Sequence, residues 1–137
     1  MVTLPITLAT ASVLGLIFVV LSALTIRARV KTNTSLGIGE SVAMGQEATA
    51  SPLLIASRTQ ANFAEYVPLS LILLALLEGW GVNDSFLVAV AVLLVLSRLL
   101  HVIGMNRSTP NPFRGGAIIL QFLLIASMAV YGLMLAV

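Results

Sequence analysis

Four long apolar segments account for most of the chain, and polar stretches separate them. A membrane hydrocarbon core of about 30 Å is crossed by roughly 20 helical residues, and each segment reaches that length. The pattern therefore predicts an all-α fold, an integral membrane four-helix bundle that forms a single domain. The predicted helices cover about residues 4–27, 52–79, 85–106 and 114–137.

The second segment carries polar side chains at a depth where lipid tails do not tolerate them. At about 100° per residue, Arg58, Asn62, Glu65 and Tyr66 fall within one stripe about 100° wide. Ionisable groups at membrane depth normally face other protein or a water-filled cavity, and they mark functional sites. We therefore predict that this stripe is the wall of a binding site.

Composition agrees with a membrane protein. Of 137 residues, 59% are apolar and 9% are charged, whereas about a quarter of residues are charged in soluble domains. The pI of about 9.7 does not indicate nucleic-acid binding, because the basic residues sit at helix ends rather than in a soluble patch. The absence of cysteine excludes disulfides and thiolate ligands. With one histidine and scattered carboxylates, no metal site is expected.

The distribution of basic residues predicts how the chain crosses the membrane. The first apolar run is too long for a signal peptide and has no basic residue before it, so we keep it as a spanning helix. The positive-inside rule then places both termini on the non-cytoplasmic side. All seven basic residues fit the cytoplasmic side: Arg27, Arg29, Lys31, Arg58, Arg98, Arg107 and Arg114.

Helix-start and helix-break signals refine the second segment. Ser51 is a plausible N-cap with Pro52 at the first helical position. Pro68 removes one backbone hydrogen bond, so a kink is expected just beyond Glu65 and Tyr66. Residues 32–51 form a long Gly/Ser/Thr-rich connection that is either a cap over the site or a linker; the sequence leaves both open.

Arg58, Arg98 and Arg114 are predicted to converge near Glu65, which leaves more positive charge than one carboxylate can neutralise. An anionic ligand would supply the missing charge. Three simpler readings stand beside this one. Arginines at helix ends can extend to lipid headgroups, and Glu65 can form a structural ion pair with Arg98. His101 and Tyr66 can serve only as hydrogen-bonding or packing residues between helices.

At these positions the chain resembles the MAPEG family, the membrane-associated proteins of eicosanoid and glutathione metabolism. The pattern most resembles its small bacterial inner-membrane branch, which is similar to microsomal glutathione transferase. The matching motifs are Arg58-x-Gln60-x-Asn62-x-x-Glu65-Tyr66-x-Pro68, Arg98-x-x-His101 and Pro110-Asn111-Pro112-Phe113-Arg114.

The resemblance implies a homotrimer that binds glutathione, as co-substrate, between neighbouring subunits near the cytoplasmic face. It implies that Arg114 stabilises the glutathione thiolate as the catalytic residue, because a fixed charge beside sulfur lowers the thiol pKa. This chain departs from the common family pattern at Met105, where an aromatic residue is frequent. The implied glutathione-binding residues are Ser22, Arg29, Arg58, Gln60, Asn62, Glu65, Tyr66, Arg98 and His101.

Two functions follow as hypotheses. The first is a glutathione-dependent transferase or peroxidase that acts on a lipophilic electrophile from the bilayer, in an inner membrane and in a detoxifying role. The second is a non-catalytic protein that holds a lipid or amphipathic anion in the groove between subunits, since a fold does not determine an activity. A transporter is disfavoured because the sequence has no inverted repeat or pair of broken helices.

Overall fold

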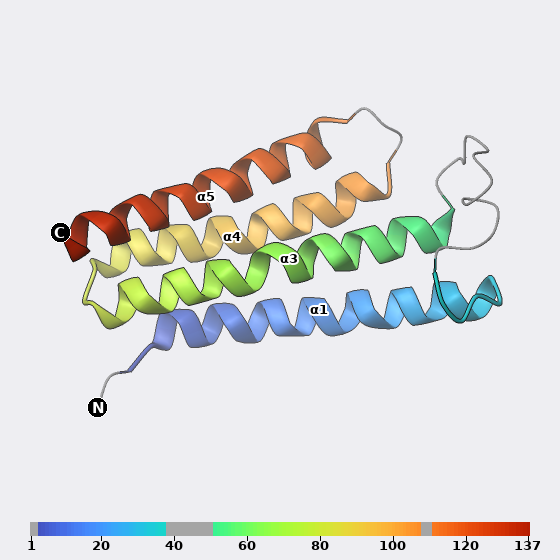
Figure 1. The fold of residues 1–137 in the computed structure, drawn as a ribbon, viewed down its shortest axis with the longest axis horizontal. Coiled ribbons are helices and arrows are strands. Elements are labelled where there is room, and N and C mark those ends of the chain that lie inside the picture. Colours follow the sequence, from blue (N-terminus) through green and yellow to red (C-terminus); the bar gives the residue numbers. More distant parts are fainter. Residues whose placement is uncertain (1–2, 38–50, 108–110) are drawn as a thin grey trace.

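The computed structural model describes residues 3–37, 51–107 and 111–137, and in these ranges it is a bundle of four long helices (Figure 1). Each helix is long and apolar enough to cross a membrane. The prediction of an all-α membrane four-helix bundle is confirmed. The helices are α1 (Pro5–Lys31), α3 (Pro52–Gly79), α4 (Asp84–Met105) and α5 (Pro112–Ala136).

Side-chain caps define where three of these helices begin. The Ser51 side chain accepts a hydrogen bond from the Leu54 amide at 3.2 Å, which confirms the predicted N-cap of α3. Asn111 caps α5 in the same way, so α5 begins at Pro112, earlier than the pattern of apolar residues indicated. Asn83 caps α4. Helix α1 continues to Lys31, beyond the predicted end at about residue 27, because basic side chains are good helix formers even after the apolar run ends.

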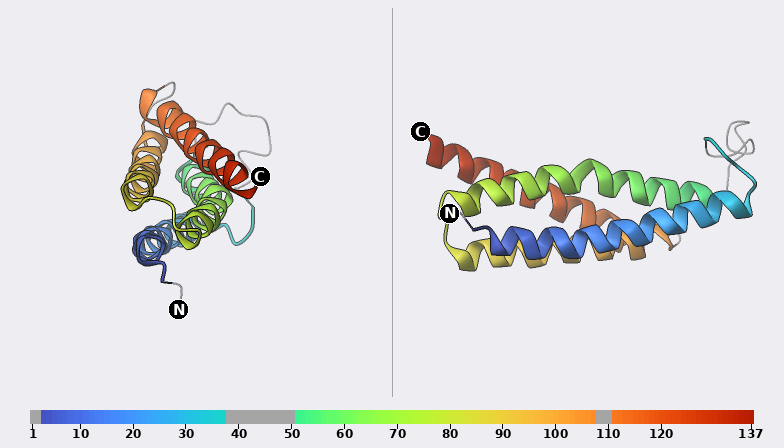
Figure 2. Two further views of the ribbon diagram at one scale, coloured as in Figure 1. Left: turned by 90° about the vertical axis from the view of Figure 1, so that its left-hand side faces the viewer. Right: turned by 90° about the horizontal axis from the view of Figure 1, so that it is seen from below.

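Successive helices run antiparallel, so the N-terminus and C-terminus lie at the same end of the bundle (Figure 1). Helix α3 contacts each of the other three helices. Figure 2 shows α3 bent near its middle, which fits the kink expected from Pro68 inside this helix. The connection of residues 32–51 falls mostly outside the described residues, so neither prediction for it is tested.

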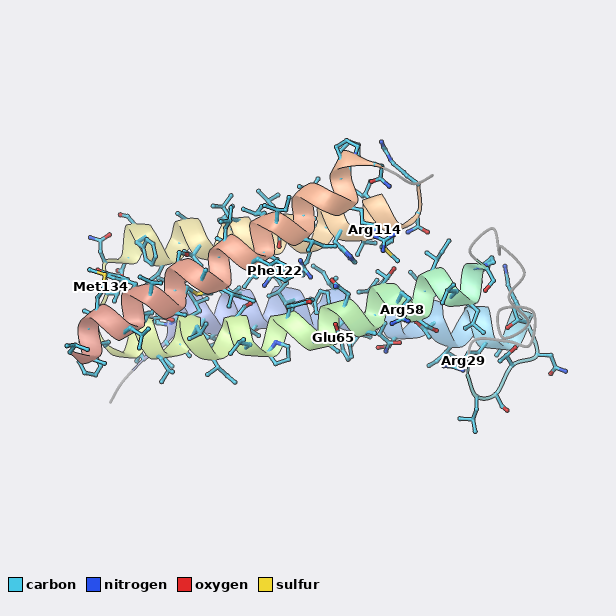
Figure 3. All side chains as sticks on the ribbon, turned by 45° about the horizontal axis from the view of Figure 1, so that its top comes forward. Arg29, Arg58, Glu65, Arg114, Phe122 and Met134 are labelled. Carbon is cyan, nitrogen blue, oxygen red and sulfur yellow. The ribbon has the colours of Figure 1, made fainter. Side chains whose placement is uncertain are left out.

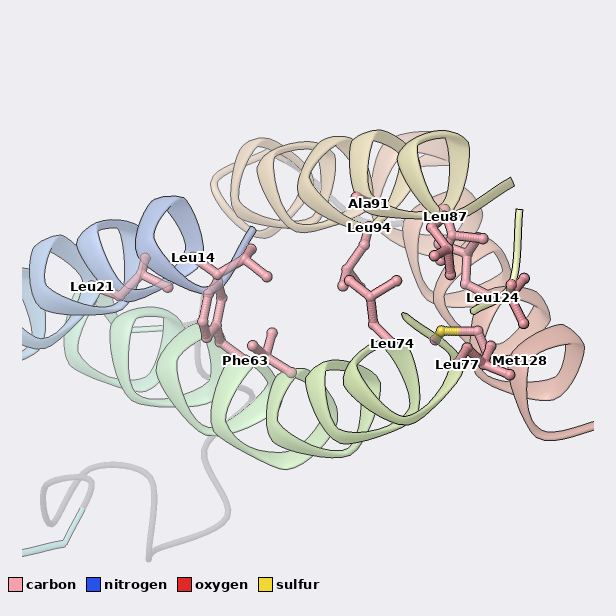
Figure 4. Close-up of a cluster of buried hydrophobic side chains, with 13 residues drawn as sticks. Leu14, Leu21, Phe63, Leu74, Leu77, Leu87, Ala91, Leu94, Leu124 and Met128 are labelled. Carbon is pink, nitrogen blue, oxygen red and sulfur yellow. The ribbon is translucent and has the colours of Figure 1, made fainter. Parts of the chain in front are cut away.

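The core is a layer of leucines between the helices, and Leu74, Leu87 and Leu94 are fully buried in it (Figure 4). Phe18 and Phe63 stack across α1 and α3 with ring centroids 5.8 Å apart. Many other large apolar side chains point out of the single chain, as expected where lipid rather than water surrounds the helices.

One carboxylate ties the start of α1 to the end of α3. The Glu78 side chain accepts hydrogen bonds from the backbone amides of Ile6 and Thr7, both at 2.8 Å. The first amides of a helix have no acceptor within that helix. Glu78 therefore acts as an N-cap supplied by a neighbouring helix. These hydrogen bonds fix the position of α1 along the axis of α3.

Candidate functional site

A cavity of about 580 Å³ opens between α3, α4 and α5, and it holds much of the predicted site. The charged side chains Arg58, Glu65 and Arg114 are exposed, Asn62 is half-buried and His101 is buried. The charged groups thus lie at the open side and the histidine lies at the base. The lining residues are Leu54, Ile55, Arg58, Ala61, Asn62, Glu65, His101, Met105, Arg114 and Ile118.

The lining is half polar and half apolar. Two arginines, an amide, a histidine and one carboxylate come from three helices, and aliphatic side chains complete the wall. Figure 3 shows Arg58 and Glu65 on α3 and Arg114 on α5 at neighbouring levels along the bundle. Such a site can hold an anionic, hydrogen-bonding molecule beside an apolar one.

A close approach of two helices carries Arg114 to the cavity. A Cβ atom added to Gly104 of α4 would lie 2.4 Å from the Arg114 backbone nitrogen, so only glycine fits there. Asn111 strengthens the junction, because its Nδ2 donates to the Gly104 carbonyl at 3.0 Å while its Oδ1 accepts from the Arg114 amide at 3.0 Å. The first turn of α5 is therefore held against α4.

Arg98 lies behind the cavity rather than in its lining. Its side chain is 1% exposed. Its Nη1 donates to Asn62 Oδ1 at 3.0 Å and its Nε donates to Ser97 Oγ at 3.2 Å. On α3, Arg98 therefore bonds to Asn62. The simpler reading of the sequence paired Arg98 with Glu65 instead.

Tyr66 packs against α5. Its ring meets Phe122 edge to face, with centroids 5.4 Å apart, and it is absent from the lining of the cavity. This geometry is the packing role considered for Tyr66 from the sequence.

Three other predicted residues lie apart from the cavity. Gln60 Nε2 donates to Ser22 Oγ at 2.9 Å, which joins α3 to α1. Arg29 Nη1 donates to the carbonyls of Ser35 and Gly37, at 3.3 and 3.2 Å. In Figure 3, Arg29 lies farther toward the end of the bundle than Arg58 and Arg114 do. Within one chain, the predicted residues therefore form two separate groups.

Sequence reasoning missed several residues that build the site. Gly104 and Asn111 position Arg114, and the Asn111-Pro112 pair was a recognisable helix-start signal. Ser70, Ser97 and Gln121 form a buried hydrogen-bonded chain behind Arg98. Nothing in the spacing of the two serines distinguished them from other small residues of membrane helices.

No cluster of three or more metal-ligating side chains occurs in residues 3–37, 51–107 and 111–137.

The fold and the site together define an integral membrane four-helix protein with a basic, partly apolar cavity near one end. Comparison with family models shows which kind: the chain belongs to the MAPEG family, whose model matches residues 7–134. Searches of curated proteins and of solved structures gave no match.

Proposed function

We propose that this protein is a glutathione-dependent membrane transferase that conjugates or reduces lipophilic electrophiles. The observation that carries the proposal is the cavity itself, whose lining combines Arg58, Arg114 and Asn62 with a single carboxylate, Glu65. Glutathione has two carboxylates and one ammonium group. The arginines and Glu65 therefore match its charges in sign and in ratio.

Arg114 is the residue assigned to the thiolate. Arginine does not act as a base near neutral pH, but its fixed charge stabilises a neighbouring thiolate and so increases the reactive fraction of glutathione. The short α4–α5 junction at Gly104 supports this role, because it holds the first turn of α5, and with it the Arg114 backbone, in a fixed place. The aliphatic side of the cavity suits an electrophile that enters from the bilayer.

The separation of the predicted residues into two groups supports a homotrimer. Ser22, Arg29 and Gln60 match the family pattern, yet they do not line the cavity of their own chain. In a trimer with the site between subunits, these residues of one subunit would reach the cavity of the next. With four membrane-spanning helices in the described residues and basic connections at one end, the termini would then lie outside the cytoplasm.

The experiment is glutathione binding and turnover by the detergent-purified protein. Adding glutathione is expected to produce thiolate absorbance, and an aryl halide is expected to be conjugated. Arg114→Ala should abolish most of both signals. The control Arg27→Gln removes another cytoplasmic-end arginine that lies outside this cavity, and it should change neither. No binding at millimolar glutathione, with the protein folded, would overturn the proposal.

The same experiment decides the alternative of a non-catalytic lipid binder. That function predicts a co-purified lipid and no effect of Arg114→Ala on any turnover. The polar lining disfavours a lipid without an anionic group, because an acyl chain alone needs neither two arginines nor an asparagine at the cavity wall. An amphipathic anion would use the same side chains, so the effect of Arg114→Ala on turnover is what separates it from the transferase.

A further inference from the structure

Arg98 is a buried cation that donates in two directions. One side of the guanidinium bonds to Asn62 on α3, and the other bonds to the neighbouring Ser97. A guanidinium has only donors, so the atom that faces it must be an acceptor. The Asn62 amide is therefore oriented with Oδ1 toward Arg98. Its Nδ2 is the atom left to meet a molecule in the cavity.

A chain of hydrogen bonds holds Arg98 from behind. Ser97 Oγ lies 3.0 Å from Gln121 Oε1, and Gln121 Nε2 donates to Ser70 Oγ at 2.7 Å. Ser70 Oγ then donates to the Tyr66 carbonyl at 2.8 Å. Ser70, Ser97 and Gln121 are fully buried. The chain links α4, α5 and α3, and it ends on a backbone carbonyl.

Ser97 connects Arg98 to the rest of the chain of hydrogen bonds. Because Arg98 can only donate, Ser97 Oγ accepts from it, and the Ser97 hydroxyl lies within donating distance of two acceptors, Gln121 Oε1 at 3.0 Å and the Leu94 carbonyl at 2.8 Å. Gln121 presents Oε1 to Ser97 and Nε2 to Ser70. A buried hydrogen-bonded network of this kind holds its members in place.

We infer that Arg98 is a positioning residue that sets the hydrogen-bonding character of the cavity through Asn62. The inference rests on the proposed function and deepens it. Asn62 offers N–H donors to the bound peptide, so the ligand group at this point is a carboxylate or carbonyl oxygen, while the ammonium group lies elsewhere. The Gln121 and Ser70 side chains support this specificity without lining the cavity themselves.

Lysine would not replace Arg98. A single ammonium nitrogen does not reach Asn62 and Ser97 with the spacing that Nε and Nη1 provide. In the described parts of the chain, Nη2 of Arg98 is buried without a hydrogen-bond partner. The network thus uses two of the three guanidinium nitrogens and leaves a positive charge just behind the cavity wall.

The test is a set of double-mutant cycles with glutathione as the ligand, measured by titration calorimetry. Arg98→Met should weaken binding at least tenfold in the wild-type background and less than threefold when Asn62→Ala is already present. Gln121→Leu, which breaks the chain far from the cavity, should weaken binding about threefold to tenfold and have no effect on Asn62→Ala. Thr25→Val, which alters a buried hydroxyl in α1 outside the network, is the matched control and should bind like wild type.

Asn62→Asp tests the assigned orientation. It keeps an acceptor for Arg98 and removes the N–H donors, so it should bind glutathione more weakly than Asn62→Ala. Binding by Asn62→Asp at wild-type strength would overturn the inference, and so would additive effects of Arg98→Met and Asn62→Ala. Both results leave the proposed function standing. Failure of the wild-type protein to bind glutathione would instead remove the proposed function, and this inference with it. Melting temperatures in detergent confirm that each variant is folded.

Discussion

Gly104→Ala is the sharpest test of how the fold builds the site. The added Cβ would lie 2.4 Å from the Arg114 nitrogen, 2.8 Å from its Cα and 2.9 Å from its Cβ. Two of these atoms are backbone and cannot rotate away. The first turn of α5 must therefore retreat from α4, and Arg114 retreats with it.

The size of the effect follows from these distances. Real Cβ contacts are essentially never shorter than 3.0 Å, so the shift is about 0.6 Å at the least, and about 1 Å for an ordinary contact. Overpacking of this kind costs about 1–3 kcal/mol, and the better helix propensity of alanine returns about 1 kcal/mol. A displacement of about 1 Å in a catalytic group lowers the rate about 100-fold. Activity should thus fall far more than stability.

The assay measures conjugation of an aryl halide and the melting temperature of the same preparations. Gly116→Ala is the matched control, because it lies on the first turns of α5 and has no atom within 4 Å of the added Cβ. It should leave the rate unchanged and raise the melting temperature slightly. If Gly104→Ala keeps the rate within threefold of wild type, the close α4–α5 junction does not position Arg114 for catalysis.

Three further predictions concern charge, capping and packing. Arg114→Ala should raise the pKa of bound glutathione toward the ordinary thiol value of about 8.5, so thiolate absorbance should appear only at higher pH; an unchanged titration curve would contradict the role of Arg114. Glu78→Gln leaves one of two helix-start amides without an acceptor, and it should cost about 1–3 kcal/mol of stability with no change in glutathione affinity. Leu74→Ala empties a fully buried position and should cost about 2–5 kcal/mol, whereas Leu133→Ala, on an exposed apolar position, should be nearly neutral in thermal unfolding.

Much of the architecture could be predicted before any coordinates. The apolar runs that predicted four membrane helices are now α1, α3, α4 and α5. Of the four residues in the predicted stripe, Arg58, Asn62 and Glu65 line the cavity, because residues three, four and seven apart share a helix face, whereas Tyr66 packs against Phe122. The Ser51 N-cap could also be predicted, because a cap depends only on the few residues that follow it in the sequence.

The contacts of Arg98 could not be predicted from the sequence. Its position in the helical repeat predicted which face of the helix carries Arg98, but not how deeply its side chain is buried. Whether it would meet Glu65, Asn62 or a ligand depended on the rotation of α4 against α3. The structure shows it bonded to Asn62 and buried. The partner of Arg29 was equally open, since it lies in the backbone turn that follows its own helix.

The sequence alone determined that the chain spans a membrane as four helices, and which polar face on α3 is too costly to present to lipid. Both conclusions rest on local physics, the length of apolar runs and the helical repeat. Only the tertiary structure decided that Gly104 brings Arg114 to that face, and that Ser97, Gln121 and Ser70 support Arg98 behind it. These contacts join residues on different helices, and they depend on helix spacing and rotation, which packing of the whole bundle sets.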